Sequence, residues 1–128
     1  MILGDTSVWI DYFHNGKTAD TVELLMARGE LYVNDVILAE LMPSILQRGE
    51  TELEYLMATL PKLSLWTDWS EIVRMQTENL KHGINKVGLP DLLIAQNAIQ
   101  NHVKLFSIDR HFSLMGGHLG FELFDGDF

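Results

Sequence analysis

Four acidic residues occupy positions from which their side chains could form one site. They are Asp5, Glu40, Asp91 and Asp109. Asp5 and Asp109 each directly follow a short apolar segment that has the length of a buried strand. Asp91 begins a segment of helical period, and Glu40 lies about one turn into another. Because sites in open α/β sheets form beyond the carboxyl ends of the strands, we expect the four carboxylates to converge there.

A converged cluster of this kind needs a compensating charge. Two carboxylates about 5 Å apart repel by about 3 kcal/mol at an effective dielectric constant of about 20, and four carboxylates add several such interactions. A divalent cation or shared protons must offset this repulsion. The sequence contains no Cys, and its 5 His form no closely spaced pair, so oxygen ligands dominate. Such ligands favour Mg²⁺ or Mn²⁺ over zinc, and these ions suit phosphoryl chemistry.

Each acid also has a purely structural explanation. Asp5 could cap the turn after its strand, and Asp91 at a helix N-terminus interacts favourably with the helix dipole. Asp109 lies in a turn, where Asp is common for conformational reasons. Glu40 is the most informative of the four, since apolar residues flank it on both sides and it is harder to explain as solvated surface. The joint pattern, rather than any single acid, carries the hypothesis of a metal site.

Short apolar segments alternate along the chain with longer segments of helical period. Strands are predicted at residues 1–4, 31–33, 63–66, 103–108 and 121–124. This alternation is typical of a parallel sheet with helices on both faces. We therefore predict an α/β fold, a three-layer α/β/α sandwich with a four- or five-stranded parallel sheet.

The helices that must carry these acids have recognisable ends. Residues 68–82 open with a capping-box signature, which predicts a helix there. Pro90 suits the first helical position of a helix over residues 91–102. Pro43 removes an amide donor inside the helical segment 36–47, so we expect that helix to kink or split.

Composition limits the classes of protein. The chain has 128 residues, 47% of them hydrophobic, and 9 Lys and Arg against 18 Asp and Glu give a formal net charge of −9. We expect one domain over residues 1–128. No apolar segment approaches the roughly 18 residues of a membrane span, and the absence of Cys suits a reducing compartment, so we expect no membrane association and a cytoplasmic protein. The acidic balance excludes indiscriminate binding to nucleic acids, because phosphates are held by an excess of Lys and Arg.

Four segments of the chain resemble, in order and spacing, the PIN-domain ribonucleases. These segments are MILGDTSVWIDYF around Asp5, VILAEL around Glu40, GLPDLLIAQNA around Asp91 and LFSIDRHF around Asp109. Within that family, the chain is most similar to the VapC-type toxins of type II toxin–antitoxin systems. The resemblance spans residues 1–112, which is nearly the whole chain.

The resemblance implies an activity. It implies that the four acids bind Mg²⁺ or Mn²⁺ and activate a water for in-line attack on an RNA phosphodiester, which leaves a 5′-phosphate and a 3′-hydroxyl. It also implies a cognate antitoxin, with its groove near the apolar helical faces around Gly49, and a homodimer. Hydroxyl groups of Thr6 or Ser7 and of Ser107 match positions near the site. Members often carry a further acid where this chain has His111, so we expect a second metal to be weakly held.

Other interpretations stay open on the residues alone. The chain could be another Mg²⁺-dependent phosphoryl-transfer domain or a flap-type nuclease, although no phosphatase-like Asp-x-Asp follows the first strand. A receiver-type signalling module would need an acceptor acid after the third strand, where Trp66 and Thr67 stand. A catalytically inert α/β binding module is the remaining alternative.

The net charge also predicts how RNA would be recognised. One or two divalent ions would cancel up to four units of the −9, leaving a net charge near −5. Non-specific attraction to RNA is still unfavourable at that charge. Recognition should therefore depend on the bound metal and a few placed cations, for which Arg110 and Lys86 are the candidates.

Overall fold

A computed structural model of the protein describes residues 1–126, and Asp127 and Phe128 lie outside the described part. The described residues form three short strands, β1 (Ile2–Gly4), β2 (Leu31–Tyr32) and β3 (Lys104–Phe106). The strands are parallel and lie in the order β2-β1-β3. The first strand is therefore central, and its carboxyl end lies between the ends of its two neighbours.

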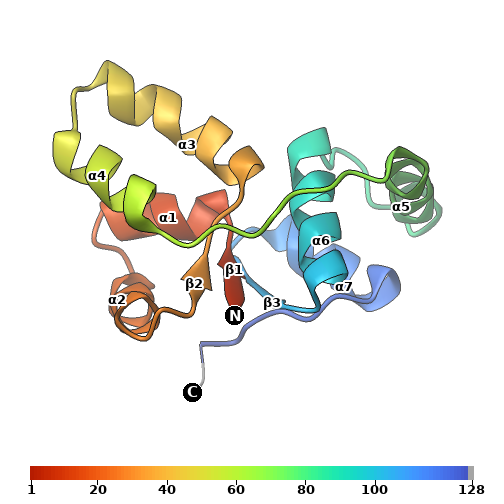
Figure 1. Cartoon of the computed structure of the whole chain (residues 1–128). Helices are drawn as coiled ribbons and strands as arrows, with labels where there is room; N and C mark the ends of the chain where they lie inside the picture. Colours follow the sequence, from red (N-terminus) through yellow and green to blue (C-terminus); the bar gives the residue numbers. More distant parts are fainter. Residues whose placement is uncertain (127–128) are drawn as a thin grey trace.

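Seven helices surround this sheet in the described part of the chain. They are α1 (Thr6–Phe13), α2 (Ala19–Ala27), α3 (Asp35–Gln47), α4 (Thr51–Thr59), α5 (Trp69–Lys81), α6 (Leu89–Asn101) and α7 (Arg110–Leu119). In Figure 1, α1–α4 lie on one side of the strands and α5–α7 on the other. The predicted α/β sandwich is confirmed. Within residues 1–126, no helix has both the length and the apolar character that crossing a bilayer requires.

The sheet has three strands rather than the predicted four or five, and the segment after α4 shows why. This segment forms a single parallel bridge to Val33, where the Leu63 amide donates to the Val33 carbonyl at 2.8 Å. Beyond it, Gln96 of α6 exchanges two hydrogen bonds with the backbone of Asp68, at 3.0 and 3.1 Å. These bonds hold the chain against α6, so the segment leaves the edge of the sheet after one residue pair.

The segment predicted as a strand at residues 121–124 is also reduced to one bridge. Leu105 and Leu123 form the only parallel pair there, and the Phe124 amide donates to the Leu105 carbonyl at 2.8 Å. The Phe124 ring packs edge-on against Phe106, with the ring centroids 5.1 Å apart. Burial of aromatic rings, rather than a strand ladder, therefore fixes this segment.

The helix that carries Glu40 is continuous through Pro43. Helix α3 runs from Asp35 to Gln47, so the expected split at Pro43 is wrong. Proline inside a helix costs about 3 kcal/mol. The face of α3 formed by Ile37, Leu41 and Ile45 is almost fully buried. Each such side chain contributes about 1.5–3 kcal/mol, which together exceeds the cost of the proline.

Helices α5 and α6 begin within two residues of their predicted starts. Asp68 caps α5, and its Oδ1 accepts a hydrogen bond from the Glu71 amide at 3.2 Å. Pro90 lies in the first turn of α6 but is preceded in the helix by Leu89. The start of α6 therefore places Asp91 in its first turn, as the sequence predicted.

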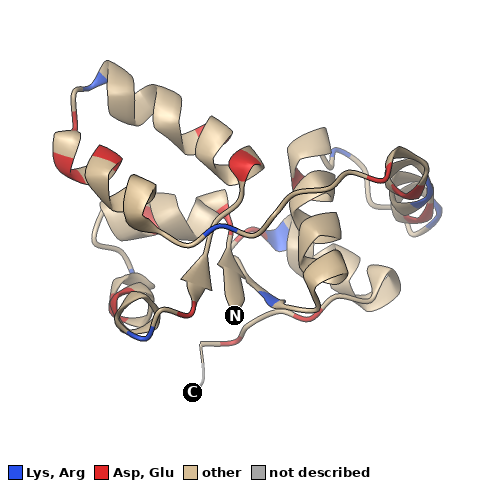
Figure 2. Cartoon of the chain, viewed as in Figure 1, with Lys and Arg blue, Asp and Glu red and all other residues tan. Residues whose placement is uncertain are grey.

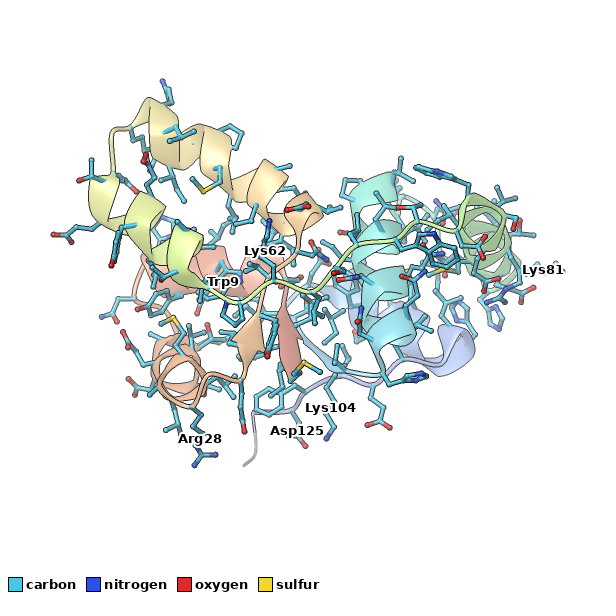
Figure 3. The ribbon with its side chains drawn as sticks, in the orientation of Figure 1. Trp9, Arg28, Lys62, Lys81, Lys104 and Asp125 are labelled. Atoms are coloured by element: carbon cyan, nitrogen blue, oxygen red, sulfur yellow. The ribbon has the colours of Figure 1, made fainter. Side chains whose placement is uncertain are left out.

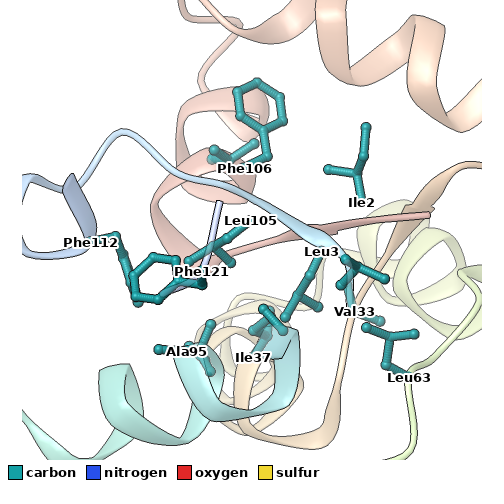
Figure 4. Packing of buried hydrophobic residues seen from close by; sticks show 14 of the residues in the cluster. Ile2, Leu3, Val33, Ile37, Leu63, Ala95, Leu105, Phe106, Phe112 and Phe121 are labelled. Atoms are coloured by element: carbon teal, nitrogen blue, oxygen red, sulfur yellow. The ribbon is translucent and has the colours of Figure 1, made fainter. Parts of the chain in front are cut away.

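The hydrophobic core covers both faces of the central strand. Leu3 and Leu105 are completely buried. Figure 4 shows Leu3 directed toward Ile37 and Ala95, whereas Ile2 points to the opposite face of the sheet. Because a strand buried on both faces has little freedom to move, the residue at its carboxyl end, Asp5, starts from a fixed position.

A buried polar network joins α3 to α6 and to the segment between α4 and α5. The Asn34 amide nitrogen Nδ2 donates to Oδ1 of Asn97 at 2.9 Å, and Nδ2 of Asn97 donates to the Ser64 carbonyl at 2.9 Å. Oδ1 of Asn34 also caps α3 by accepting from the Ile37 amide at 2.9 Å. The network sets the position of α3 relative to α6, and therefore of Glu40 relative to Asp91.

We expect Asn34→Ala to lower the free energy of unfolding by about 2–4 kcal/mol, because it removes a helix cap and leaves the buried Oδ1 of Asn97 without the donor that it accepts from. Urea denaturation followed by tryptophan fluorescence measures the change. Asn85→Ala, at an exposed loop position, is the control and should stay within about 0.5 kcal/mol of wild type. Equal stability of the two variants would contradict a stabilising role for the network.

Candidate active site

Asp5 lies at the carboxyl end of β1 and is fixed by four hydrogen bonds. Its amide donates to the Phe106 carbonyl at 3.0 Å. Its Oδ1 caps α1 by accepting from the Val8 amide at 3.1 Å and from the Ser7 hydroxyl at 2.7 Å, and its Oδ2 accepts from the Ser107 hydroxyl at 2.6 Å. The residue is only 3% exposed. Asp5 is thus the N-cap of α1, in agreement with its structural explanation, and its carboxylate is also held in one orientation.

Glu40 reaches the same end of the sheet from α3. Its Oε1 accepts a hydrogen bond from the Thr6 hydroxyl at 2.6 Å, which places it next to the start of α1. Glu40 is nevertheless exposed. Glu40 is therefore explained as solvated surface more easily than expected, because the buried face of α3 is formed by Ile37, Leu41 and Ile45 and does not include Glu40.

Asp91, Asp109 and His111 form the tightest group. Asp91 lies in the first turn of α6, and Asp109 caps α7 by accepting from the His111 amide at 2.9 Å. Nδ1 of His111 lies 3.4 Å from Oδ2 of Asp91 and 3.5 Å from Oδ1 of Asp109. One potential ligand atom from each of the three residues lies within 4.8 Å of the other two. The sequence had marked His111 only as a departure from the family pattern.

Serine hydroxyls connect Asp5 to Asp109. The Asp109 amide donates to the Ser107 hydroxyl oxygen at 2.9 Å, and the same hydroxyl donates to Asp5. The Ile108 amide donates to the Ser7 hydroxyl oxygen at 3.1 Å. The hydroxyls of Thr6, Ser7 and Ser107 therefore all contact carboxylates of the predicted cluster, Thr6 that of Glu40 and the two serines that of Asp5. Their role is to orient the carboxylates and the turn that carries Asp109.

The pKa values of two acids reflect both burial and repulsion within the cluster. Burial raises the pKa of Asp5 above its ordinary value, and the Asp109 carboxylate raises it further, whereas the serine hydroxyls and the Val8 amide oppose the shift. Burial also raises the pKa of Asp91, with further upward contributions from the charges of Asp109 and Glu40, while His111 opposes them. All four predicted acids therefore lie close enough to interact electrostatically.

We expect Asp91→Asn to stabilise the metal-free protein at neutral pH. Burial and the charge of Asp109 raise the pKa of Asp91 in the folded protein above its ordinary value of 3.8, so as pH rises the unfolded chain loses this proton first. Ionisation of Asp91 therefore lowers the free energy of unfolding. The loss grows as pH rises from 3.8 to the raised pKa, and it is complete above the raised pKa. Melting curves in chelator should show the variant above wild type at pH 7, with the difference vanishing below pH 3.8.

Asp20→Asn is the matched control, because Asp20 is an exposed acid in the first turn of α2 and lies outside the cluster. Both substitutions remove a carboxylate from a helix N-terminus, which alone costs about 0.3–1 kcal/mol. A melting temperature of Asp91→Asn below wild type at every pH would contradict repulsion within the cluster.

The residues present fit a divalent cation. Oxygen atoms of Asp91 and Asp109 face a His111 nitrogen that is buried and has no hydrogen-bond partner in the described chain. Neighbouring ligands on one octahedral ion lie about 3 Å apart. The His111 nitrogen lies 3.4 and 3.5 Å from the two oxygens, and all three ligand atoms lie within 4.8 Å of one another. Asp91, Asp109 and His111 would hold such an ion, with Asp5 and Glu40 adding negative charge beside it.

Basic residues are mostly distant from this cluster or paired. Figure 2 shows Lys and Arg scattered over loops and helix ends rather than gathered into one basic surface in this view. Figure 3 places Arg28, Lys81 and Lys104 toward the outer ends of their elements. Lys62 is paired with Asp35 at 3.0 Å.

Arg110 differs from these cations because of its place beside the cluster. With Asn85 and His82, it lines a groove of about 420 Å³ that extends to His111. Within residues 1–126, Arg110 forms no ion pair with an acid. The groove therefore offers an uncompensated positive charge next to the carboxylates.

The fold and the site define a class: an α/β domain with carboxylates converging at the strand ends, where they can hold a divalent cation. Comparison with known protein families then identifies the family. The PIN domain family model matches residues 2–117, and the chain belongs to this family. No curated protein matches the chain in sequence.

Solved structures share this fold. The chain is similar to VapBC2 from Rickettsia felis bound to a promoter DNA fragment, with a TM-score of 0.74 and 19% identity, covering 97% of this chain and 98% of that chain. DNA-bound VapBC from Salmonella typhimurium gives a TM-score of 0.77 and 18% identity, covering 98% of both chains. FitAcB from Neisseria gonorrhoeae gives 0.68 and 17%, with the same coverage of both chains.

Proposed function

We propose that this PIN-domain protein is a metal-dependent endoribonuclease toxin of the VapC type, neutralised by a cognate antitoxin. The observation that supports the nuclease activity most is the meeting of Asp91, Asp109 and the unpartnered His111 nitrogen at the end of β3. Likeness to the VapBC chains supports the toxin assignment.

Mg²⁺ or Mn²⁺, when bound, supplies the positive charge that activates a water and neutralises a phosphoryl oxygen. The protein's own residues position the reactants. Asp5 is preorganised by the Ser7 and Ser107 hydroxyls and so needs no reorientation. Thr6 engages Oε1 of Glu40, which leaves Oε2 to accept a proton from the attacking water. The proposed substrate is RNA, which such a water would cleave to a 5′-phosphate and a 3′-hydroxyl.

The direct test is cleavage of labelled RNA by the purified chain with Mg²⁺ or Mn²⁺, compared with excess chelator. Branched DNA and phosphate monoesters tested in parallel separate an endoribonuclease from a flap-type nuclease or another phosphoryl-transfer domain. RNA cleavage that survives excess chelator would contradict a metal-dependent mechanism.

Arg110 is proposed to bind a phosphate of the RNA beside the site. We expect Arg110→Ala to lower kcat/KM for RNA by roughly tenfold and to reduce the salt dependence of binding by about one charge, since one phosphate contact is lost. Binding and cleavage measured over a salt series give both numbers. Lys104→Ala is the control, because Lys104 lies at the opposite end of β3 from the carboxylates. Equal effects of the two substitutions would count against a phosphate contact at Arg110.

The antitoxin is proposed to bind in a groove of about 740 Å³ between α1, α3 and the start of α4. Its lining includes apolar Ile10, Phe13, Leu41 and Leu53 together with Glu40. An apolar groove of this kind suits the apolar face of a partner helix. Because Glu40 belongs both to the groove and to the carboxylate cluster, a helix in the groove would also obstruct the site.

A homodimer completes the proposed assembly, as the family resemblance implies. Sedimentation equilibrium of the chain without antitoxin measures its mass directly. A monomer at all accessible concentrations would remove the dimer from the proposal without affecting the nuclease site.

A further inference from the structure

His111 stands inside the acidic cluster in an unusual way for a surface histidine. Its backbone amide donates to Oδ1 of Asp109 at 2.9 Å, which anchors the start of α7 to that carboxylate. Its side chain is 36% exposed, yet Nδ1 itself is buried and has no hydrogen-bond partner in the described chain. A buried nitrogen that faces two carboxylates at 3.4 and 3.5 Å, both long for a hydrogen bond, requires an explanation.

A simple ion pair explains this geometry poorly. N–H···O hydrogen bonds have donor–acceptor distances of about 2.7–3.2 Å. The Nδ1 distances to Asp91 and Asp109 are 3.4 and 3.5 Å, nearly equal and both longer than that range. An imidazole nitrogen at nearly equal distances from two carboxylates, with all three ligand atoms within 4.8 Å of one another, resembles ligands arranged around a common centre.

We infer that Nδ1 of His111 binds the cation directly, together with Oδ2 of Asp91 and Oδ1 of Asp109, and gives the site a preference for first-row transition ions over Mg²⁺. The inference rests on the proposed metal-dependent function and specifies its metal. Imidazole nitrogen is a better ligand for transition ions than for Mg²⁺, which prefers oxygen. A His at this position therefore supplies a nitrogen ligand, which favours transition ions, where an acid would supply an oxygen ligand, which suits Mg²⁺.

The other histidine near the site is engaged elsewhere. His82 lines the same groove as His111, but its ring stacks on His118 with centroids 4.1 Å apart. Nδ1 of His82 lies 2.8 Å from the Glu78 carbonyl oxygen, and Nε2 of His118 lies 2.7 Å from Oδ1 of Asn79. His111 is therefore the nitrogen ligand that the geometry favours, and His82 is the competitor that an experiment must exclude.

Pulsed electron paramagnetic resonance of the full chain loaded with Mn²⁺ tests the inference, because a coordinated imidazole gives a ¹⁴N coupling that ¹⁵N-histidine labelling replaces. We expect the coupling in wild type, in His82→Asn and in His102→Asn, and its loss in His111→Asn. His102 is a matched control, being exposed at the end of α6 in a left-handed conformation that Asn tolerates. Melting curves verify that each variant is folded.

The affinities for Mn²⁺ and Mg²⁺ give a second readout. Their ratio would not change if the role of His111 were only structural. Calorimetric titration should show Mn²⁺ binding at least about tenfold weaker in His111→Asn, with Mg²⁺ binding changed by less than about threefold. His111→Asp should strengthen Mg²⁺ binding relative to wild type, because it supplies an oxygen ligand, and should narrow the ratio of Mn²⁺ to Mg²⁺ affinity. An unchanged ratio in both variants would overturn the inference.

The remaining outcomes distinguish this inference from the proposed function. Mn²⁺ bound without a nitrogen coupling, or with a coupling that only His82→Asn removes, overturns the role of His111 and leaves a metal-dependent nuclease intact. Absence of any Mn²⁺ binding by folded wild-type protein overturns both.

Discussion

Asp91→Asn is expected to reduce metal-dependent RNA cleavage by about a thousandfold or more. The substitution removes one negative ligand from the group formed with Asp109 and His111. Stabilisation of transition-state charge by a bound ion amounts to several kcal/mol, and each 1.36 kcal/mol lost is a factor of about ten in rate. Single-turnover cleavage of labelled RNA at saturating Mn²⁺ measures the loss in the chemical step.

The loss must be separated from unfolding. Asp91→Asn is expected to be more stable than wild type at neutral pH in chelator, because it relieves repulsion from Asp109 and Glu40. An inactive variant with a raised melting temperature is thus evidence for a functional carboxylate. Asp20→Asn should retain full activity. If Asp91→Asn cleaved RNA like wild type, Asp91 would be structural; if wild type neither bound metal nor cleaved RNA, a catalytically inert binding module would be favoured.

Most of the fold could be predicted because the signals were local. The cap at Asp68 and the proline in the first turn of α6 predicted two helix starts to within two residues. Strand pairing is different, because it depends on partners distant in sequence. The segments that bridge to Val33 and Leu105 are apolar and short like true strands, but contacts with α6 and with aromatic rings limit each to one residue pair.

The convergence of the carboxylates could be predicted because Asp5, Asp91 and Asp109 stand at the ends of elements. Glu40 lies between one and two turns into α3. What the sequence could not supply was their mutual geometry. The Asn34 to Asn97 hydrogen bond spans 63 residues and has no periodic signal, yet it sets the distance between α3 and α6. Likewise, only the actual start of α7 shows that Nδ1 of His111 is directed at Asp91 and Asp109.

The distribution of charge explains how an acidic protein could act on RNA. Ion pairs such as Arg74 with Glu71 and Lys81 with Glu78 neutralise cations on α5, away from the carboxylates. Arg110 keeps its charge beside them. A protein of this kind should bind RNA weakly outside the site, so the cation and Arg110 would determine where the chain binds.

Ile10→Asp is expected to release the proposed toxin from its antitoxin while leaving cleavage by the free protein unchanged. Ile10 is 45% exposed and lines the groove between α1 and α3, so a charged residue there should not disturb the core. Placing a carboxylate against the apolar face of a partner helix should cost about 2–4 kcal/mol, typical of a central interface residue. That corresponds to a loss of affinity of about 30- to 800-fold.

The measurement is a titration of RNA cleavage with the proposed antitoxin, which is first to be isolated as a small protein that co-purifies with the wild-type chain and suppresses its activity. Leu24→Asp is the matched control, because Leu24 is 40% exposed on α2 and does not line the groove. Suppression should fail at stoichiometric antitoxin for Ile10→Asp alone. If both variants were suppressed like wild type, the antitoxin would bind elsewhere, and Glu40 could not be obstructed through this groove. If only Ile10→Asp were no longer suppressed, the antitoxin would bind in the groove that Glu40 helps to line. One bound helix would then both fill the groove and cover the carboxylate cluster, which explains how binding inhibits cleavage.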